Sequence, residues 1–200
     1  NPVVMAVAMI ILVLSATDIS YERYFVSAQM IHFMLGPVTV ALAIPLARQL
    51  PKLRRSLLPL TVGLLCGSLT AIISAVLIVI WMGGSQELAL SIGPKSATTP
   101  IAMSIADRIG GVPSIAAAIV ILTGAFGALI ARYLFNWMRI SSPEIRGFAL
   151  GLAAHGIGTA RAFQVSKEIG TFAGLGMGLN GVLTALLAPS LVPVIVNYFY

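Results

Sequence analysis

Apolar stretches of about 20 residues recur along the chain, and a helix of that length is what crosses the hydrocarbon core of a bilayer. Hydrophobic residues make up 58% of the 200 residues and charged residues only 9%. This composition leaves too little polar surface to cover a water-soluble domain. The ten-residue alternation typical of an outer-membrane β-barrel does not occur. We therefore predict an all-α polytopic membrane protein in which residues 1–200 form a single transmembrane domain.

Glycine, proline and charged residues divide this apolar sequence into elements. We expect spans at residues 2–17, 57–82, 114–137 and 171–200, and elements interrupted by helix breakers at residues 24–49, 86–109 and 147–166. In the element at 24–49, Gly36, Pro37 and Pro45 predict a kink or a break. Because the chain begins with Asn1 rather than Met, we expect its true start to be missing.

Basic residues give the chain a formal net charge of +6 and fall mostly near the ends of the predicted segments. They therefore indicate orientation in a membrane rather than binding to nucleic acid. The densest basic loop, residues 48–55, is placed in the cytoplasm by the positive-inside rule.

Two of the interrupted elements contain an unusual mixture of residues, at 92–102 and 154–162. Each combines helix breakers and hydroxyl side chains with a basic or titratable residue, Lys95 in the first and His155 in the second. Broken backbone at membrane depth is tolerated only where it is buried in protein or lines a wet cavity. The two segments therefore form a candidate substrate site.

A shift of sixty residues aligns the chain with itself and places Lys95 on His155 and Thr99 on Thr159. We predict an internal repeat, about 57–111 and 117–171. If the element at 86–109 re-enters rather than crosses, both basic loops become cytoplasmic and the repeats are inverted. We expect the two broken or re-entrant helices to meet near the bilayer midplane, with full crossing as the alternative.

The chemistry of these segments suits a small organic anion. A helix that starts inside the membrane directs unpaired N–H groups and a partial positive charge toward whatever precedes it. Hydroxyls donate hydrogen bonds, glycines allow a ligand to approach the backbone closely, and a guanidinium binds a carboxylate through two parallel hydrogen bonds. The candidate substrate-binding residues are Lys95, Ser96, Thr98, Thr99, His155, Gly156, Gly158, Thr159, Arg161 and Asn180.

Each candidate also has a purely structural explanation. Lys95 is explained equally by snorkelling from a helix end, and His155 by a hydrogen bond to a neighbouring carbonyl in the core. Arg161 is explained by an ion pair with Glu168 or Glu87. Hydroxyl and amide side chains, Asn180 among them, also bond helix to helix in membranes.

The sequence contains no motif for a metal, cofactor or catalytic site. We find no metal-ligand spacing, nucleophile elbow, phosphate-binding loop or pair of catalytic carboxylates, so no metal, cofactor or catalytic residue is expected and the chain is not expected to be an enzyme. The single cysteine, Cys66, forms no disulfide within the chain.

Four stretches carry a resemblance to a known family: residues 35–46, 94–102, 154–162 and 174–181. Through them the chain resembles the LrgB/CidB family of bacterial membrane proteins, which is also similar to one half of the plastidial glycolate/glycerate translocator. Ala154 stands where the family favours serine, and Arg161 where lysine is commoner. The resemblance implies a multi-pass protein of the bacterial inner membrane with an antiholin-like role, modulating murein hydrolase activity and lysis beside a smaller holin-like partner of the LrgA/CidA type.

Two functions follow from these observations. The first is a carrier or facilitator of small monocarboxylates such as glycolate, glycerate, lactate or pyruvate, which the plastidial relative also implies. The alternative is a holin or antiholin component that acts in the lipid bilayer as a homo-oligomer, without a substrate of its own. The sequence favours the first function because a protein that gates membrane lesions has no need of paired broken helices.

Overall fold

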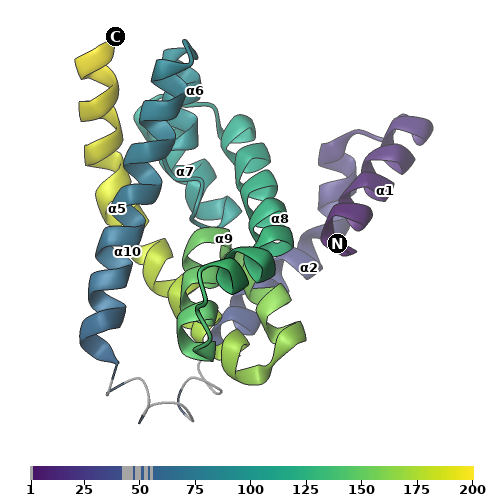
Figure 1. Ribbon diagram of the computed structural model, residues 1–200. Helices are drawn as coiled ribbons and strands as arrows, with labels where there is room; N and C mark the ends of the chain where they lie inside the picture. Colours follow the sequence, from purple (N-terminus) through teal and green to yellow (C-terminus); the bar gives the residue numbers. More distant parts are fainter. Residues whose placement is uncertain (1, 42–46, 48–50, 52–53, 55) are drawn as a thin grey trace. The chain divides into compact units, whose positions relative to one another are not determined.

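The computed structural model describes residues 2–41, 47, 51, 54 and 56–200 (Figure 1). Throughout this part of the chain the regular structure is helical, which confirms the all-α prediction. The chain separates into two compact units, Asn1–Leu50 and Pro51–Tyr200, and each is described by itself.

The first unit contains helices α1 (Pro2–Thr17) and α2 (Tyr21–Ala41). Asp18 turns the chain between them with a φ of 51°. The backbone of α2 stays helical through Gly36 and Pro37, so the helix does not break there. Pro45 and the side chain of His32 lie outside the described residues.

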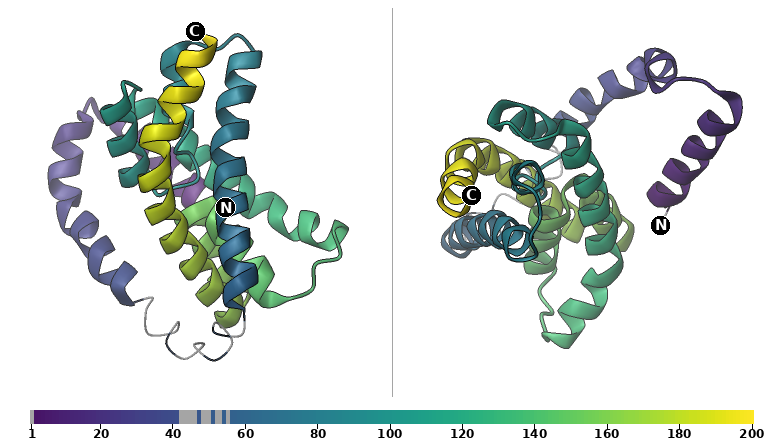
Figure 2. Two further views of the ribbon diagram at one scale, coloured as in Figure 1. Left: turned by 90° about the vertical axis from the view of Figure 1, so that its left-hand side faces the viewer. Right: turned by 90° about the horizontal axis from the view of Figure 1, so that it is seen from above.

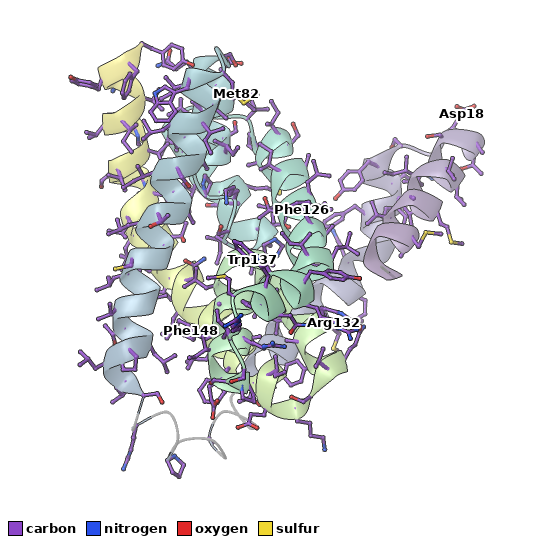
Figure 3. All side chains as sticks on the ribbon, in the orientation of Figure 1. Asp18, Met82, Phe126, Arg132, Trp137 and Phe148 are labelled. Carbon is purple, nitrogen blue, oxygen red and sulfur yellow. The ribbon has the colours of Figure 1, made fainter. Side chains whose placement is uncertain are left out.

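Among the described residues, three helices of the second unit are long and apolar enough to cross a membrane: α5 (Leu57–Trp81), α8 (Pro113–Trp137) and α10 (Lys167–Phe199). Helices α5 and α10 run side by side in both views of Figure 2. Large apolar side chains on the outside of these helices, such as Phe126 (Figure 3), are exposed as lipid contact requires.

The first interrupted element consists of α6 (Gln86–Ile92) and α7 (Thr99–Ile109), joined by residues 93–98. The chain reverses direction at residues 93–98, so that α7 runs back alongside α6. The Ser91 hydroxyl at the end of α6 accepts a hydrogen bond of 2.8 Å from the backbone N–H of Val112, beyond the end of α7. A Cβ at Gly111 would lie 3.0 Å from Ser91, so a side chain there would prevent this approach. We call α6 and α7 the first hairpin and residues 93–98 the first tip.

The second interrupted element is α9 (Pro143–Val165), whose backbone leaves the helical region at Ala154 and His155. His155 has a φ of 40° and a ψ of −134°, a conformation that costs strain in any residue except glycine. Beyond this break the helix folds back on its own first half. The closeness of the two halves is seen at Gly158, where a Cβ would lie 2.7 Å from the Leu150 carbonyl oxygen. We call α9 the second hairpin and residues 152–156 the second tip.

The two hairpins pack against opposite ends of α10. Leu90 in the first hairpin belongs to one buried cluster with Val192 and Val196, near the end of α10. Leu150 and Ala173 belong to another cluster, near the start of α10. The two tips therefore approach the middle of α10 from opposite directions.

Helices α5 and α8 each have 25 residues, end in a tryptophan and precede an interrupted element. Their bounds differ by 56 residues at both ends (113 − 57 and 137 − 81), whereas the sequence alignment used sixty. Trp81 and Trp137 are 75% and 81% exposed, which suits side chains that anchor a helix at a membrane interface. The inverted repeat itself stays a prediction.

Candidate functional site

The two tips meet at Asn180, on α10, which is completely buried. Its amide nitrogen donates one hydrogen bond to the Ser96 carbonyl in the first tip, at 2.9 Å, and one to the Leu152 carbonyl in the second, at 3.1 Å. Its amide oxygen accepts from Ser68 on α5 at 2.6 Å and, more weakly, from Thr184 at 3.4 Å. One side chain thus joins segments that are far apart in the sequence.

Lys95 lies in the first tip and is half-buried. Among the described residues, the only hydrogen-bond partner of its ammonium group is the Ser96 hydroxyl, at 3.4 Å, which is long for a bond from a charged donor. The ammonium also lies within electrostatic reach of His155. A cation removed from water without a close counter-charge is costly, so this position suits an anionic ligand.

His155 lies in the second tip and is 3% exposed. Its Nε2 is 2.8 Å from the carbonyl oxygen of Val120 on α8. Because a carbonyl only accepts, we assign the proton to Nε2, which leaves Nδ1 of the neutral ring as an acceptor. The absence of a side chain at Gly124 makes room for the ring, since a Cβ there would lie 2.6 Å from Cε1 of His155.

Within the described residues, the only hydrogen bond of the imidazole is the one at Nε2. That bond fits the core explanation of His155, and Nδ1 is the ring atom that a binding role would use.

The threonines in and next to the two tips differ in how far their hydroxyls are engaged. Thr98 and Thr99 are half-buried at the start of α7, and Thr98 is the N-cap residue without a capping bond from its side chain. The hydroxyl of Thr159, by contrast, donates to the His155 carbonyl at 2.8 Å and contacts the sulfur of Met177 at 3.8 Å. Thr98 and Thr99 are therefore the better placed to donate to a ligand.

The remaining predicted residues fall into different surroundings. Gly156 is half-buried, and a Cβ there would meet only the Met177 sulfur, at 3.9 Å, so backbone is approachable at this point. Gly158 is buried against the first half of α9 and serves packing. Arg161 is exposed, donates to Gln164 at 3.2 Å and takes no part in the hydrogen bonds at Asn180. Its predicted role in binding stays a prediction.

Sequence reasoning missed Ser68, which is buried and makes the shortest hydrogen bond to Asn180. The signal was a serine in the middle of a predicted span made mostly of apolar residues. Such a hydroxyl needs a partner, but its sequence position does not say which one.

The two tips carry groups with positive charge or partial positive charge. Helix α7 begins at Thr99, directly after the first tip, and the second half of α9 begins at the second tip. The N–H groups of a first helical turn have no partner within the helix, and the dipole adds a partial positive charge. Together with Lys95, these groups make the junction of the tips suited to a small anion.

Comparison with known proteins gives consistent results. A protein-family model described as the LrgB-like family matches residues 1–194. The chain is 37% identical over 191 residues to the uncharacterized protein YwbG of Bacillus subtilis (strain 168), covering 96% of this chain and 85% of that protein. It is 29% identical over 195 residues to the antiholin-like protein LrgB of Bacillus cereus (strain B4264), covering 98% and 85%. No solved structure matches the chain.

Proposed function

Because the chain belongs to the LrgB-like family and its two tips meet around a half-buried lysine, we propose that it carries small monocarboxylates across a membrane. Glycolate, glycerate, lactate and pyruvate are the candidate substrates. The observation that supports the proposal most strongly is Lys95, whose ammonium has only the Ser96 hydroxyl as a hydrogen-bond partner among the described residues. A bound carboxylate would supply the missing counter-charge.

In this proposal each group at the tips has a separate task. The Lys95 ammonium attracts the carboxylate, and the first N–H groups of α7 with the hydroxyls of Thr98 and Thr99 donate hydrogen bonds to it. His155 contributes Nδ1, which accepts from the hydroxyl of a hydroxycarboxylate when the ring is neutral. None of these tasks requires a covalent step, and we propose a carrier rather than an enzyme.

The proposal is tested with purified protein reconstituted into liposomes. We expect proteoliposomes to take up labelled glycolate at a rate that saturates with concentration, and unlabelled glycerate or pyruvate to compete. Protein-free liposomes serve as the control. Proteoliposomes as impermeable to all four acids as empty vesicles would rule out the carrier.

We further propose that the protein is a multi-pass protein of the bacterial inner membrane, with the start of α10 facing the cytoplasm. Basic residues gather at this end of the second unit: Arg132, Arg139, Arg146 and Lys167. At the opposite end, where α6 starts and α7 finishes, the described charged residues are Glu87, Asp107 and a single basic residue, Arg108. The positive-inside rule therefore gives the orientation.

This orientation predicts the labelling of single cysteines by a membrane-impermeant thiol reagent. In a Cys66→Ala background, we expect Met82→Cys to react in intact cells and Ser141→Cys to react only after the membrane is opened. Both residues are exposed in loops of the second unit, at its opposite ends. Reaction of both variants in intact cells would contradict the proposed topology.

A second function has one specific observation in its favour, because the similar protein of Bacillus cereus is named antiholin-like. A component of that kind would act through homo-oligomers or a smaller holin-like partner and would change lysis without binding a carboxylate. Lysis effects that persist when Lys95 is replaced would favour this second function.

A further inference from the structure

Asn180 was expected from the sequence to bind substrate, but its side chain is fully engaged by the protein. The amide group offers two N–H donors and one oxygen with two acceptor positions. Both donors are used, on the carbonyls of Ser96 and Leu152, and both acceptor positions are used, by Ser68 and Thr184. No hydrogen-bonding capacity remains for a ligand.

The two donors are divided between the two tips, one to each. The amide oxygen is held by Ser68 on α5 and by Thr184, one turn further along α10. The short bond from Ser68 fixes the orientation of the amide plane, so that both N–H groups point at the tips. The carbonyls that accept them adjoin the functional side chains, since Ser96 follows Lys95 and Leu152 lies three residues before His155.

We propose that Asn180 is a positioning residue, a shared latch that holds the two tips together and so places Lys95 and His155 on a common ligand. This inference rests on the proposed carrier function. Each tip can move away only by breaking its own N–H bond, and the other bond can persist while it does. Asn180 thereby allows the tips to be released one at a time, as a carrier that opens alternately to the two sides needs.

The test compares Asn180→Leu, which keeps the size of the side chain and removes all of its hydrogen bonds, with the control Thr184→Val, which is nearly isosteric and removes only the weak bond of 3.4 Å. Ser68→Ala removes the short bond that orients the amide, so it is a test variant with an intermediate expected effect. Asn180→Asp is a further test variant, since it keeps the acceptor for Ser68 and lacks the amide donors. All variants are examined as full-length protein in liposomes.

Two measurements are made on each variant. The first is the half-saturation concentration and the maximal rate of glycolate uptake. The second is the distance distribution between spin labels at Ser104→Cys in α7 and Ala153→Cys in the second tip, in a Cys66→Ala background. Both labelled positions are exposed. The distance measurement reports on the tips whether or not the protein transports anything.

We expect Asn180→Leu and Asn180→Asp to broaden the distance distribution and to raise the half-saturation concentration about tenfold, while the control Thr184→Val changes either value less than about threefold. A merely structural role would lower the amount of active protein, and hence the maximal rate, with the half-saturation concentration unchanged. A narrow, wild-type distance distribution in both Asn180 variants would overturn the latch. Wild-type protein that moves no carboxylate but whose label distances depend on Asn180 would overturn the carrier and leave the latch supported.

Discussion

Replacement of Lys95 by glutamine is expected to lower the initial rate of glycolate uptake into proteoliposomes by about a hundredfold. The ammonium is half-buried in the first tip, and the Ser96 hydroxyl is its only hydrogen-bond partner among the described residues. A hydrogen bond between charged partners contributes about 1.5–3 kcal/mol, and loss of the counter-charge for a partly desolvated carboxylate adds to this. The measurement is uptake of labelled glycolate below saturation, at equal amounts of reconstituted protein.

The matched control is Lys167→Gln, which removes the same charge at an exposed position, the first residue of α10. We expect this variant to keep uptake within about twofold of wild type, because an exposed charge is screened by salt over about 8–10 Å. Lys95→Arg should fall between the two, since it keeps the charge but replaces a compact ammonium by a planar fork. Equal losses in Lys95→Gln and Lys167→Gln would contradict a specific role for Lys95.

Two of the three long helices were predicted from the sequence to within a residue, whereas α10 was expected at 171–200 and begins four residues earlier, at Lys167. Helix α5 was expected at 57–82 and is found at Leu57–Trp81, and α8 was expected at 114–137 and is found at Pro113–Trp137. Both have mostly apolar sequence bounded by strong helix signals, Gly83-Gly84 after α5 and Pro113 before α8. Local chemistry decides such boundaries, and so local sequence predicts them.

The breaks themselves were also visible in the sequence, but their geometry was not. Gly93 and Pro94 predict an interruption between α6 and α7. In α9 the reversal occurs at Ala154 and His155, and His155 takes a positive φ that its residue type disfavours. That conformation is held by tertiary contacts, including the bond from His155 to α8, which no local pattern reports.

The role of a polar side chain depends on which partners the fold brings to it. An asparagine on an apolar helix predicts a buried hydrogen-bonding group, but the same amide can serve a ligand or a backbone carbonyl. At Asn180 the tips supply the carbonyls. Arg161 shows the reverse case, since the helix that restarts after the break leaves it exposed and bonded to Gln164.

Replacement of Gly151 by alanine is expected to destabilise the folded protein by about 3 kcal/mol or more. In the structure, the first half of α9 lies directly against the start of α10. A Cβ at Gly151 would overlap the carbonyl oxygen of Ala173 and lie 2.6 Å from its carbonyl carbon. Backbone atoms of a packed helix cannot rotate away as a side chain can, so the two helices must separate. The measurement is the thermal midpoint of the purified protein in detergent, followed by size-exclusion chromatography after heating.

Gly178→Ala on α10 is the matched control, because a Cβ at Gly178 has no atom within 4 Å. There the added methyl group meets open space, and alanine favours a helix over glycine by about 1 kcal/mol. We therefore expect Gly178→Ala to keep or raise the thermal midpoint, while Gly151→Ala lowers it by several degrees. The same separation of α9 from α10 moves Leu152, whose carbonyl accepts from Asn180, so Gly151→Ala should also broaden the distance between the tips. A Gly151→Ala protein as stable as Gly178→Ala would show that α9 and α10 do not pack at this distance, and the junction of the tips would lose its support.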